Sequence, residues 1–252
     1  SAFSRTADNG TTWNQLSLVD TKISKIVDLA LSPNYSQDGS LFLLTHRSGG
    51  KHSLWRSMNG GARWERVYSG TLTGVTTIER VAVSPQYGKS KVVYLAGTSS
   101  APAIWQSTDN GQTFNPRNTN RPVSGTSFSV DTWAVVNDTT LFVGSYDGSN
   151  GVVYQTTSAG SWYATEAVAG NQTLYRLVLS PHYAQDKTLL VGNTNGWVYW
   201  SNDEGKSFQS LPPNATTPPL TGSISIAFDD RYASNKTVYA ASDSGDKGIY
   251  RY

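Results

Sequence analysis

The chain has 252 residues, of which 37% are hydrophobic, 12% aromatic and only 15% charged. This composition excludes a helical bundle or coiled coil, which is rich in Ala, Glu, Lys and Leu, and a disordered chain, which lacks aromatic residues. The formal net charge of +2 gives no electrostatic reason to bind nucleic acid. No apolar run approaches the roughly 20 residues that cross a membrane, so we expect no membrane-embedded segment.

The first predicted elements are a strand at residues 3–6, the turn phrase TADNGTTW at 6–13 and a strand at about 13–18. The next unit contains a strand at 26–31, the corner SPNY at 32–35, strands at 41–44 and 54–56, and a second copy of the phrase at 57–64. Later units repeat this order, although the third has lost the corner. Further copies of the phrase stand at 107–114 and 201–208, with a degenerate copy at 156–162.

The glycines of the five copies are 51, 50, 49 and 45 residues apart. A period near 50 with four short strands per unit is typical of β-propeller blades. The sequence therefore predicts an all-β, five-bladed β-propeller in one domain over residues 1–252, with four antiparallel strands per blade. The predicted blades are residues 24–68, 76–118, 128–168, 173–212, and 223–252 completed by 3–18.

The repeated phrase is predicted to form a tight hairpin turn. Its Asp or Asn side chain accepts hydrogen bonds from nearby backbone N–H groups, and its Gly supplies a positive φ. The aromatic residue at its end begins the next strand and is expected to pack inward, as are Trp55, Trp105, Trp162 and Trp200. We assign these structural roles to Asp8, Gly10, Trp13, Asn59, Gly61, Trp64, Asp109, Gly111, Phe114, Asp203, Gly205 and Phe208.

The phrase resembles the Asp-box, or bacterial neuraminidase repeat, of sialidases, xyloglucan-cleaving glycoside hydrolases, sortilin-type receptors and many exported bacterial propellers. The resemblance covers nearly every unit and implies a propeller whose boxes are structural and lie away from the active face. It also implies an extracellular or cell-surface location. Residues 1–4 show no basic start before an apolar run, so a signal peptide is expected to be absent or already removed.

Both ends of the chain carry the strand that precedes a box, at residues 3–6 and 248–252. We expect the N-terminal strands to complete the last blade and close the propeller, which would hide the open sheet edges. The alternative is that the sequence is a piece of a larger propeller.

The loops on the face away from the boxes differ from unit to unit, and we place a ligand site there. The candidates are His46, His52, Tyr146, Asp147 and Trp197, the last because exposed aromatic rings suit sugars or protein partners.

The first strand of each unit is expected to line a central channel. Alternation then places Leu29 and Leu31 in the core between sheets and Asp28 and Ala30 toward the channel. Arg80 and Arg176 stand at matching positions, where two guanidinium groups could hold a carboxylate or sulfate. This resembles the sialidase arginine cluster, but the Arg-Ile-Pro motif of that family is missing. The alternative is that Asp28 pairs with an arginine.

Glycosidases need two carboxyl groups, one of them with a raised pKa. The candidate acids, Asp28, Asp131, Asp147, Asp243 and Asp246, stand among Gly and Ser residues without an apolar pocket. His46, His52 and His182 do not form a metal-ligand set, and the chain has no cysteine. The sequence therefore predicts no catalytic residues, no metal and no cofactor.

The function predicted from the sequence is a non-catalytic extracellular binding propeller that recognises a glycan or a protein partner through its variable loops. One alternative is a self-assembling structural subunit of an extracellular layer or filament. The other is a sialidase-like or glycanase-like hydrolase.

Overall fold

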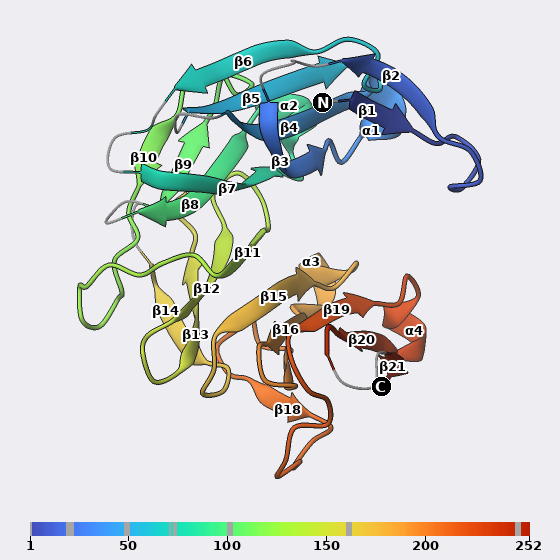
Figure 1. Ribbon diagram of the computed structural model, residues 1–252. Helices are drawn as coiled ribbons and strands as arrows, with labels where there is room; N and C mark the ends of the chain where they lie inside the picture. The colour runs from blue at the N-terminus through green and yellow to red at the C-terminus, as the bar shows by residue number, and fades with distance from the viewer. Residues whose placement is uncertain are drawn as a thin grey trace. The chain divides into compact units, whose positions relative to one another are not determined.

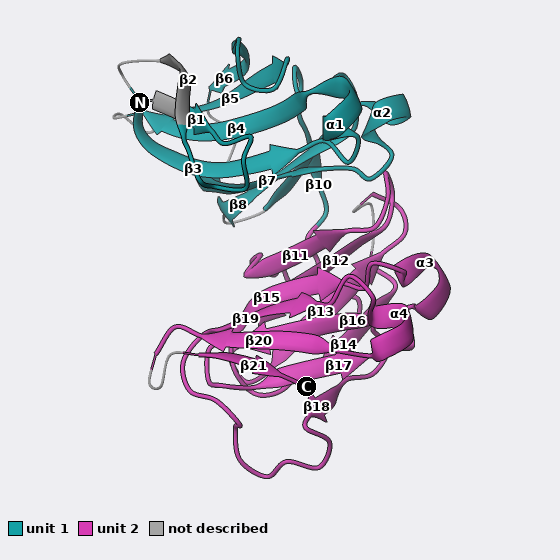
Figure 2. Cartoon of the chain, turned by 90° about the vertical axis from the view of Figure 1, so that its right-hand side faces the viewer, with its two compact units in different colours: residues 1–118 teal, residues 119–252 magenta. Residues whose placement is uncertain are grey.

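The computed structural model describes residues 2–18, 23–47, 51–70, 72, 75–99, 103–159, 163–244 and 248–252. The chain divides into two compact units, Ser1–Asn118 and Thr119–Tyr252, which Figure 2 shows in different colours. Each unit is built from antiparallel sheets joined in sequence order. Trp162 and Gly160 of the degenerate box, and Asp246, lie outside the described residues.

Unit 1 contains three sheets (Figure 1). The first is two-stranded, with β1 (Ala2–Arg5) and β2 (Asn14–Leu18). The second consists of β3 (Ile23–Leu31), β4 (Ser40–Arg47), β5 (Lys51–Met58) and β6 (Glu65–Gly70). The third consists of β7 (Val75–Val83), β8 (Val93–Ser99), β9 (Ile104–Ser107) and β10 (Asn115–Arg117).

Unit 2 also contains three sheets. The first consists of β11 (Thr132–Val135), β12 (Leu141–Tyr146), β13 (Gly151–Thr156) and β14 (Thr165–Val168). The second consists of β15 (Leu174–Leu179), β16 (Leu189–Asn193), β17 (Val198–Ser201) and β18 (Gln209–Leu211). The third has three strands, β19 (Ile224–Phe228), β20 (Val238–Ser242) and β21 (Ile249–Arg251).

The prediction of four antiparallel strands per unit is confirmed for four sheets. The N-terminal strands β1 and β2 form a sheet of their own, and β19–β21 form another. A closed ring of five blades in one domain is not confirmed and stays a prediction. Among the described residues, no helix has the length and apolar character that a membrane crossing requires.

Within each unit the sheets pack face to face, and apolar side chains fill the space between them. In unit 1 Phe42 and Leu44 of β4 meet Val81 and Val83 of β7 in one buried cluster. In unit 2 Phe142 of β12 packs with residues of the β15–β18 sheet in the same way. Because both faces of these strands are covered, strands such as β4 and β12 are apolar on both sides, and Trp55 and Trp105 are buried as expected.

The predicted orientation of β3 is wrong. Leu29 and Leu31 are 41% and 50% exposed, whereas Ala30 packs against the cluster between β3–β6 and β7–β10. The Asp28 carboxylate also points to that sheet, since its Oδ2 accepts the Val81 N–H at 2.9 Å. The reason is geometric: alternate residues of a strand share one face, so Asp28 and Ala30 together face the following sheet, and Leu29 and Leu31 lie on the opposite face of β3.

Four one-turn helices form the corners after the first strand of a sheet. They are α1 (Tyr35–Asp38), α2 (Tyr87–Ser90), α3 (Tyr183–Asp186) and α4 (Tyr232–Asn235). Each ends in a left-handed residue whose N–H donates to the carbonyl of the corner tyrosine. These residues, in order, are Gly39, Lys91, Lys187 and Lys236.

The repeated phrase forms the predicted turn, which we call the box turn. In the 107–114 copy, the Ser107 hydroxyl accepts the Gly111 N–H at 2.8 Å and donates to Asp109 Oδ1 at 2.7 Å. The Asp109 carboxylate also accepts the Thr113 N–H at 2.9 Å. The same bonds recur in the 6–13 and 201–208 copies, and Asn59 replaces the acid in the 57–64 copy. The four glycines have φ of +76° to +91°.

The aromatic residues at the ends of the box turns do not all pack inward. Phe114 and Phe208 pack against buried clusters, but Trp13 is 65% exposed. The expectation for Trp13 is wrong because its box turn belongs to the two-stranded sheet β1–β2, which has no corner helix of its own.

We expect Asp109→Ala to lower the free energy of unfolding by about 0.5–1.5 kcal/mol at neutral pH, because the change removes hydrogen bonds to a charged acceptor while water can reach the exposed donors. Burial raises the pKa of Asp109, but hydrogen bonds from Thr113 and Ser107 outweigh it and lower the pKa to about 2. The stabilisation is therefore present above the unfolded pKa of 3.8 and decreases as the pH falls from there toward 2. Urea unfolding at a series of pH values measures both effects.

Asp109→Asn should cost less than Asp109→Ala, since Asn59 accepts the Arg63 N–H at 2.8 Å in its own box turn. Thr108→Ala is the control, because Thr108 is the exposed residue directly before Asp109. Equal losses for the control and for Asp109→Ala would contradict the prediction.

Candidate binding site

Box turns contact the corners of their own sheets, the segments between the first and second strands, through a backbone hydrogen bond. We call a turn held by this bond seated on its corner. The residue before each box glycine has a positive φ, and its N–H donates to the carbonyl of the last corner residue. The donors and acceptors are Gly60 and Gly39 (2.9 Å), Asn110 and Lys91 (3.1 Å), Ala159 and Thr139 (2.7 Å), and Glu204 and Lys187 (3.3 Å).

Side chains reinforce this contact in two sheets. In the β7–β10 sheet the Tyr87 hydroxyl donates to Asn110 Oδ1. In the β15–β18 sheet the Lys187 ammonium lies 3.1 Å from the Glu204 carboxylate. The corner tyrosine and the corner lysine therefore both serve as partners for the box residue that precedes the glycine.

A seated box turn also fills the space beside the preceding sheet. A Cβ added at Gly111 would lie 3.1 Å from Leu54 and 3.2 Å from Phe42, so only glycine fits without displacement. A Cβ at Gly205 would lie 2.9 Å from Phe142. The corner, the box turn and the preceding sheet are thus packed together at these two positions.

No box turn among the described residues is seated on the α4 corner. Its sheet has three strands, and no described residue donates a hydrogen bond to the Lys236 carbonyl. A cavity of about 300 Å³ lies here, between the corner and the preceding β15–β18 sheet. We call it the α4-corner cavity, and its lining includes Trp200, Leu211, Tyr232, Lys236, Val238 and Tyr252.

The α4-corner cavity offers an apolar and aromatic surface with a few polar groups at its side. The Trp200 indole N–H donates to the Tyr232 hydroxyl at 3.2 Å, and the Lys236 ammonium lies 5.1 Å from the centre of the Tyr232 ring. Burial raises the pKa of Tyr252, so its hydroxyl stays neutral. Such a lining suits an apolar or aromatic side chain with a hydrogen-bond donor beside it.

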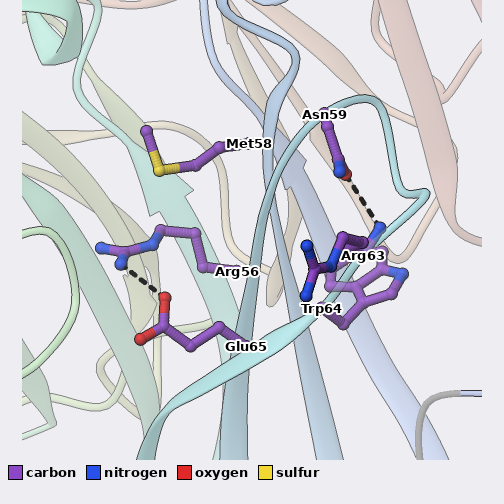
Figure 3. Close-up of a pocket in the computed structure, with 6 residues that line it drawn as sticks. All are labelled: Arg56, Met58, Asn59, Arg63, Trp64 and Glu65. Atoms are coloured by element: carbon purple, nitrogen blue, oxygen red, sulfur yellow. Dashed lines mark hydrogen bonds and ion pairs between the residues drawn. The ribbon is translucent and has the colours of Figure 1, made fainter.

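A second cavity of about 300 Å³ lies at the 57–64 box turn of unit 1 (Figure 3). The Arg56 guanidinium there points to the Glu65 carboxylate at 2.8 Å and also donates to the Asn110 carbonyl at 3.0 Å. Asn59 is occupied in its own turn, where it accepts the Arg63 N–H. Because these polar groups already have partners in the fold, this cavity is a weaker candidate.

The structure brings two of the predicted ligand residues together. His46 of β4 and His52 of β5 are paired across the strands, with ring centroids 4.9 Å apart. His52 is 3% exposed, and its Nε2 accepts the Ile78 N–H of the neighbouring sheet at 3.1 Å. Burial and the charge of His46 both lower the pKa of His52, whereas Glu79 raises it. In this structure His52 joins two sheets as a neutral acceptor.

The remaining predicted residues mostly stabilise local structure. Asp147 accepts the Ser149 and Asn150 N–H groups at 2.8 and 2.6 Å, and these bonds lower its pKa. Tyr146 is half-buried beside it. Trp197 is half-buried and stacks on Tyr199 with ring centroids 6.1 Å apart.

The two arginines proposed as an anion clamp lie in different units. Arg80 of β7 pairs with Glu79 at 3.7 Å, and Arg176 of β15 is exposed. Asp28 accepts the backbone N–H groups of Leu29 and Val81. Their joint role in binding stays a prediction.

The pKa shifts of the carboxyl groups bear on whether any of them is a catalytic acid. Every described carboxyl group with a resolved shift has a lowered pKa: Asp8, Asp38, Asp109, Asp147, Asp203 and Asp229. A glycosidase general acid needs a raised pKa. Among the described residues no group of three or more His, Asp or Glu side chains is placed to hold a metal ion.

The residues of the α4-corner cavity were not selected by the sequence analysis, which assigned only structural turns to this side of the sheets. The packing of a box turn on its corner, which places the cavity, is visible only in the structure.

No protein-family model matches the chain. The chain is 27% identical over 250 residues to a xyloglucanase from Paenibacillus sp, in an alignment that covers 83% of this chain and 23% of the xyloglucanase. It therefore spans about a quarter of the length of that curated relative. The solved structure titled "YCF48 bound to D1 peptide" matches 99% of this chain and 71% of its own, with a TM-score of 0.64 and 10% identity. These likenesses support the β-propeller fold.

We expect the stability of the protein to fall as the pH decreases below about 6.5, because the unfolded chain takes up a proton that folded His52 excludes. The loss attributable to this residue is at most about 1.4 kcal/mol per pH unit. His52→Gln keeps an acceptor for the Ile78 N–H but does not titrate, so its urea unfolding should depend less on pH. His182→Gln, at the exposed start of α3, is the matched control, and the same pH dependence in all three proteins would contradict the prediction.

Proposed function

We propose that the chain is a non-catalytic binding propeller that recognises a protein partner by accepting an apolar or aromatic side chain in the α4-corner cavity. The observation that carries this proposal is the cavity itself. It is lined by Trp200, Leu211 and Tyr232 at the place where other corners hold a box turn. An aromatic-lined cavity with few polar groups is typical of the central pocket of a protein interface.

The chemistry of the lining favours a protein side chain over a charged ligand. Lys236 is its only charged side chain, and this ammonium already lies over the Tyr232 ring. The fold is compatible with peptide recognition, since the YCF48 structure is titled as bound to a peptide. At 10% identity this likeness supports the fold and not a common partner.

The proposal includes an extracellular or cell-surface location. Its support is the resemblance of the repeated phrase to the Asp-box of exported propellers. The hydrogen bonds of the Ser107 hydroxyl and the Asp109 carboxylate within the box turn are consistent with the resemblance to an Asp-box.

A second candidate function, glycan binding or hydrolysis, is favoured by the xyloglucanase similarity. The lowered pKa values of carboxyl groups such as Asp109, Asp147 and Asp203 weigh against hydrolysis. Incubation with xyloglucan and measurement of released reducing ends tests it directly. A hydrolase of the sialidase type would lose that activity in the double variant Arg80→Ala, Arg176→Ala.

The protein-binding proposal is tested with indole as a probe for an aromatic side chain. We expect saturable binding in ligand-observed NMR, and we expect Leu211→Arg to weaken it roughly tenfold or more, because the guanidinium occupies the cavity and resists desolvation. Val168→Arg introduces the same side chain at an exposed valine of the same unit and should leave binding unchanged. Non-saturable binding, or equal binding by both variants, would refute the proposal.

A further inference from the structure

Arg56 lines the cavity at the 57–64 box turn, and contacts within unit 1 fix the orientation of its guanidinium. Its side chain is only 10% exposed. Its Nη1 donates to the Asn110 carbonyl of the β7–β10 sheet at 3.0 Å, and its Nη2 donates to Glu65 Oε2 at 2.8 Å. The Nε–H is buried and has no hydrogen-bond partner. Because a buried N–H without an acceptor is costly, this unpaired group requires an explanation.

The unpaired Nε–H and the Nη2 group lie on the same edge of the guanidinium plane. Carboxylates bind such an edge with two parallel hydrogen bonds, but Glu65 makes only one of them. The Glu65 side chain is 68% exposed, so its ion pair is weak, and its carboxylate returns to water easily. The edge is therefore only half used, and the group that holds it is one that a second carboxylate could displace.

The rest of the cavity adds a second cation and apolar surface to this edge. Met58 and Arg56 lie on one side of the cavity, which has a volume of about 300 Å³, and Arg63 and Trp64 lie on the other (Figure 3). Met58 is 56% exposed, and Arg63 is also exposed. Two guanidinium groups against the single carboxylate of Glu65 make the lining net positive.

The residue types of this lining favour a protein partner. Met, Trp and Arg are enriched at the centre of protein interfaces relative to the remaining surface. A net positive charge beside an exposed methionine and a tryptophan matches a segment that presents an acidic side chain next to an apolar one.

We infer that this cavity binds an acidic side chain of a protein partner, whose carboxylate replaces Glu65 and accepts hydrogen bonds from both Arg56 Nε and Arg56 Nη2. The residue beside that acid packs on Met58 and Trp64, and Arg63 faces the negative charge. The Asn110 carbonyl keeps Nη1 in place while the acid is exchanged. The site lies within unit 1 and shares no residue with the α4-corner cavity, so the inference goes beyond the proposed function.

A titration of the full, isotope-labelled chain with the peptide acetyl-Leu-Glu-Leu-amide tests the inference by NMR. We expect the Arg56 Nε–H signal, assigned by its absence from the Arg56→Lys spectrum, to move downfield with saturation as this group gains an acceptor. Arg56→Lys retains the charge but not the two-bond edge. It should weaken binding, measured from the backbone amide shifts of residues 58–65, roughly tenfold or more. The peptide with Gln in place of Glu should not bind.

Glu65→Gln is the most informative variant, because it removes the carboxylate that competes for the edge. We expect it to bind the acidic peptide roughly two- to fivefold more tightly than the unmodified chain does. An Arg56–Glu65 pair with a structural role alone predicts no such gain, and a folding defect does not raise affinity. Arg231→Lys is the matched control, since Arg231 is an exposed arginine of unit 2 that pairs with Asp230 at 3.8 Å, and it should leave binding unchanged.

Three results would overturn the inference: equal binding of the Glu and Gln peptides, no gain of affinity in Glu65→Gln, or an Arg56 Nε–H signal that does not move. Preference for oligogalacturonate, an acidic glycan, over the peptide would also overturn it. Leu211→Arg, which blocks the α4-corner cavity, should retain the response of Arg56 to the peptide. This arm separates failure of the present inference from failure of the proposed function, which the indole titration reports.

Discussion

The seating of a box turn on its corner is the interaction on which the rest of the structure depends. A positive-φ residue donates its N–H to a left-handed corner carbonyl, as Asn110 does to Lys91. The contact joins the connection between the third and fourth strands of a sheet to the connection between its first and second strands. Because the box glycine also touches the preceding sheet, as Gly111 touches Leu54, one small turn determines both the end of its own sheet and the distance to its neighbour.

A second set of contacts joins sheets near the middle of their strands. Side-chain acceptors on one sheet receive backbone N–H groups from the first strand of the next: Asp28 from Val81, His52 from Ile78 and Thr132 from Leu177. These acceptors have different chemistry but the same task, since an unpaired N–H between packed sheets is costly. Several residues that look like ligand or catalytic groups in the sequence are used in this way, which is why the strongest candidate site lies elsewhere.

The seating contact recurs along the chain. Box turns at residues 57–64, 107–114 and 201–208 are seated on the α1, α2 and α3 corners, and Ala159 of the degenerate copy donates its N–H to the Thr139 carbonyl. In a repeat protein this recurrence shows which groups complete the contact. The similarity to a xyloglucanase and to the YCF48 structure supports the propeller fold, and the choice of partner rests on the chemistry of the cavity.

The sequence by itself determined the strand content, the period, the box turns and the corner tyrosines, because these depend on local chemistry: a carboxylate folded back onto backbone N–H groups, a glycine with positive φ and short alternating strands. It placed Leu29 in the core, Asp28 toward a channel and Trp13 inside, and the structure places all three differently. Only the tertiary structure decided those orientations and revealed the α4-corner cavity. Burial of a side chain depends on which sheet covers it, and the pairing of residues such as Asn110 and Lys91 depends on segments brought together by packing rather than by their order in the chain.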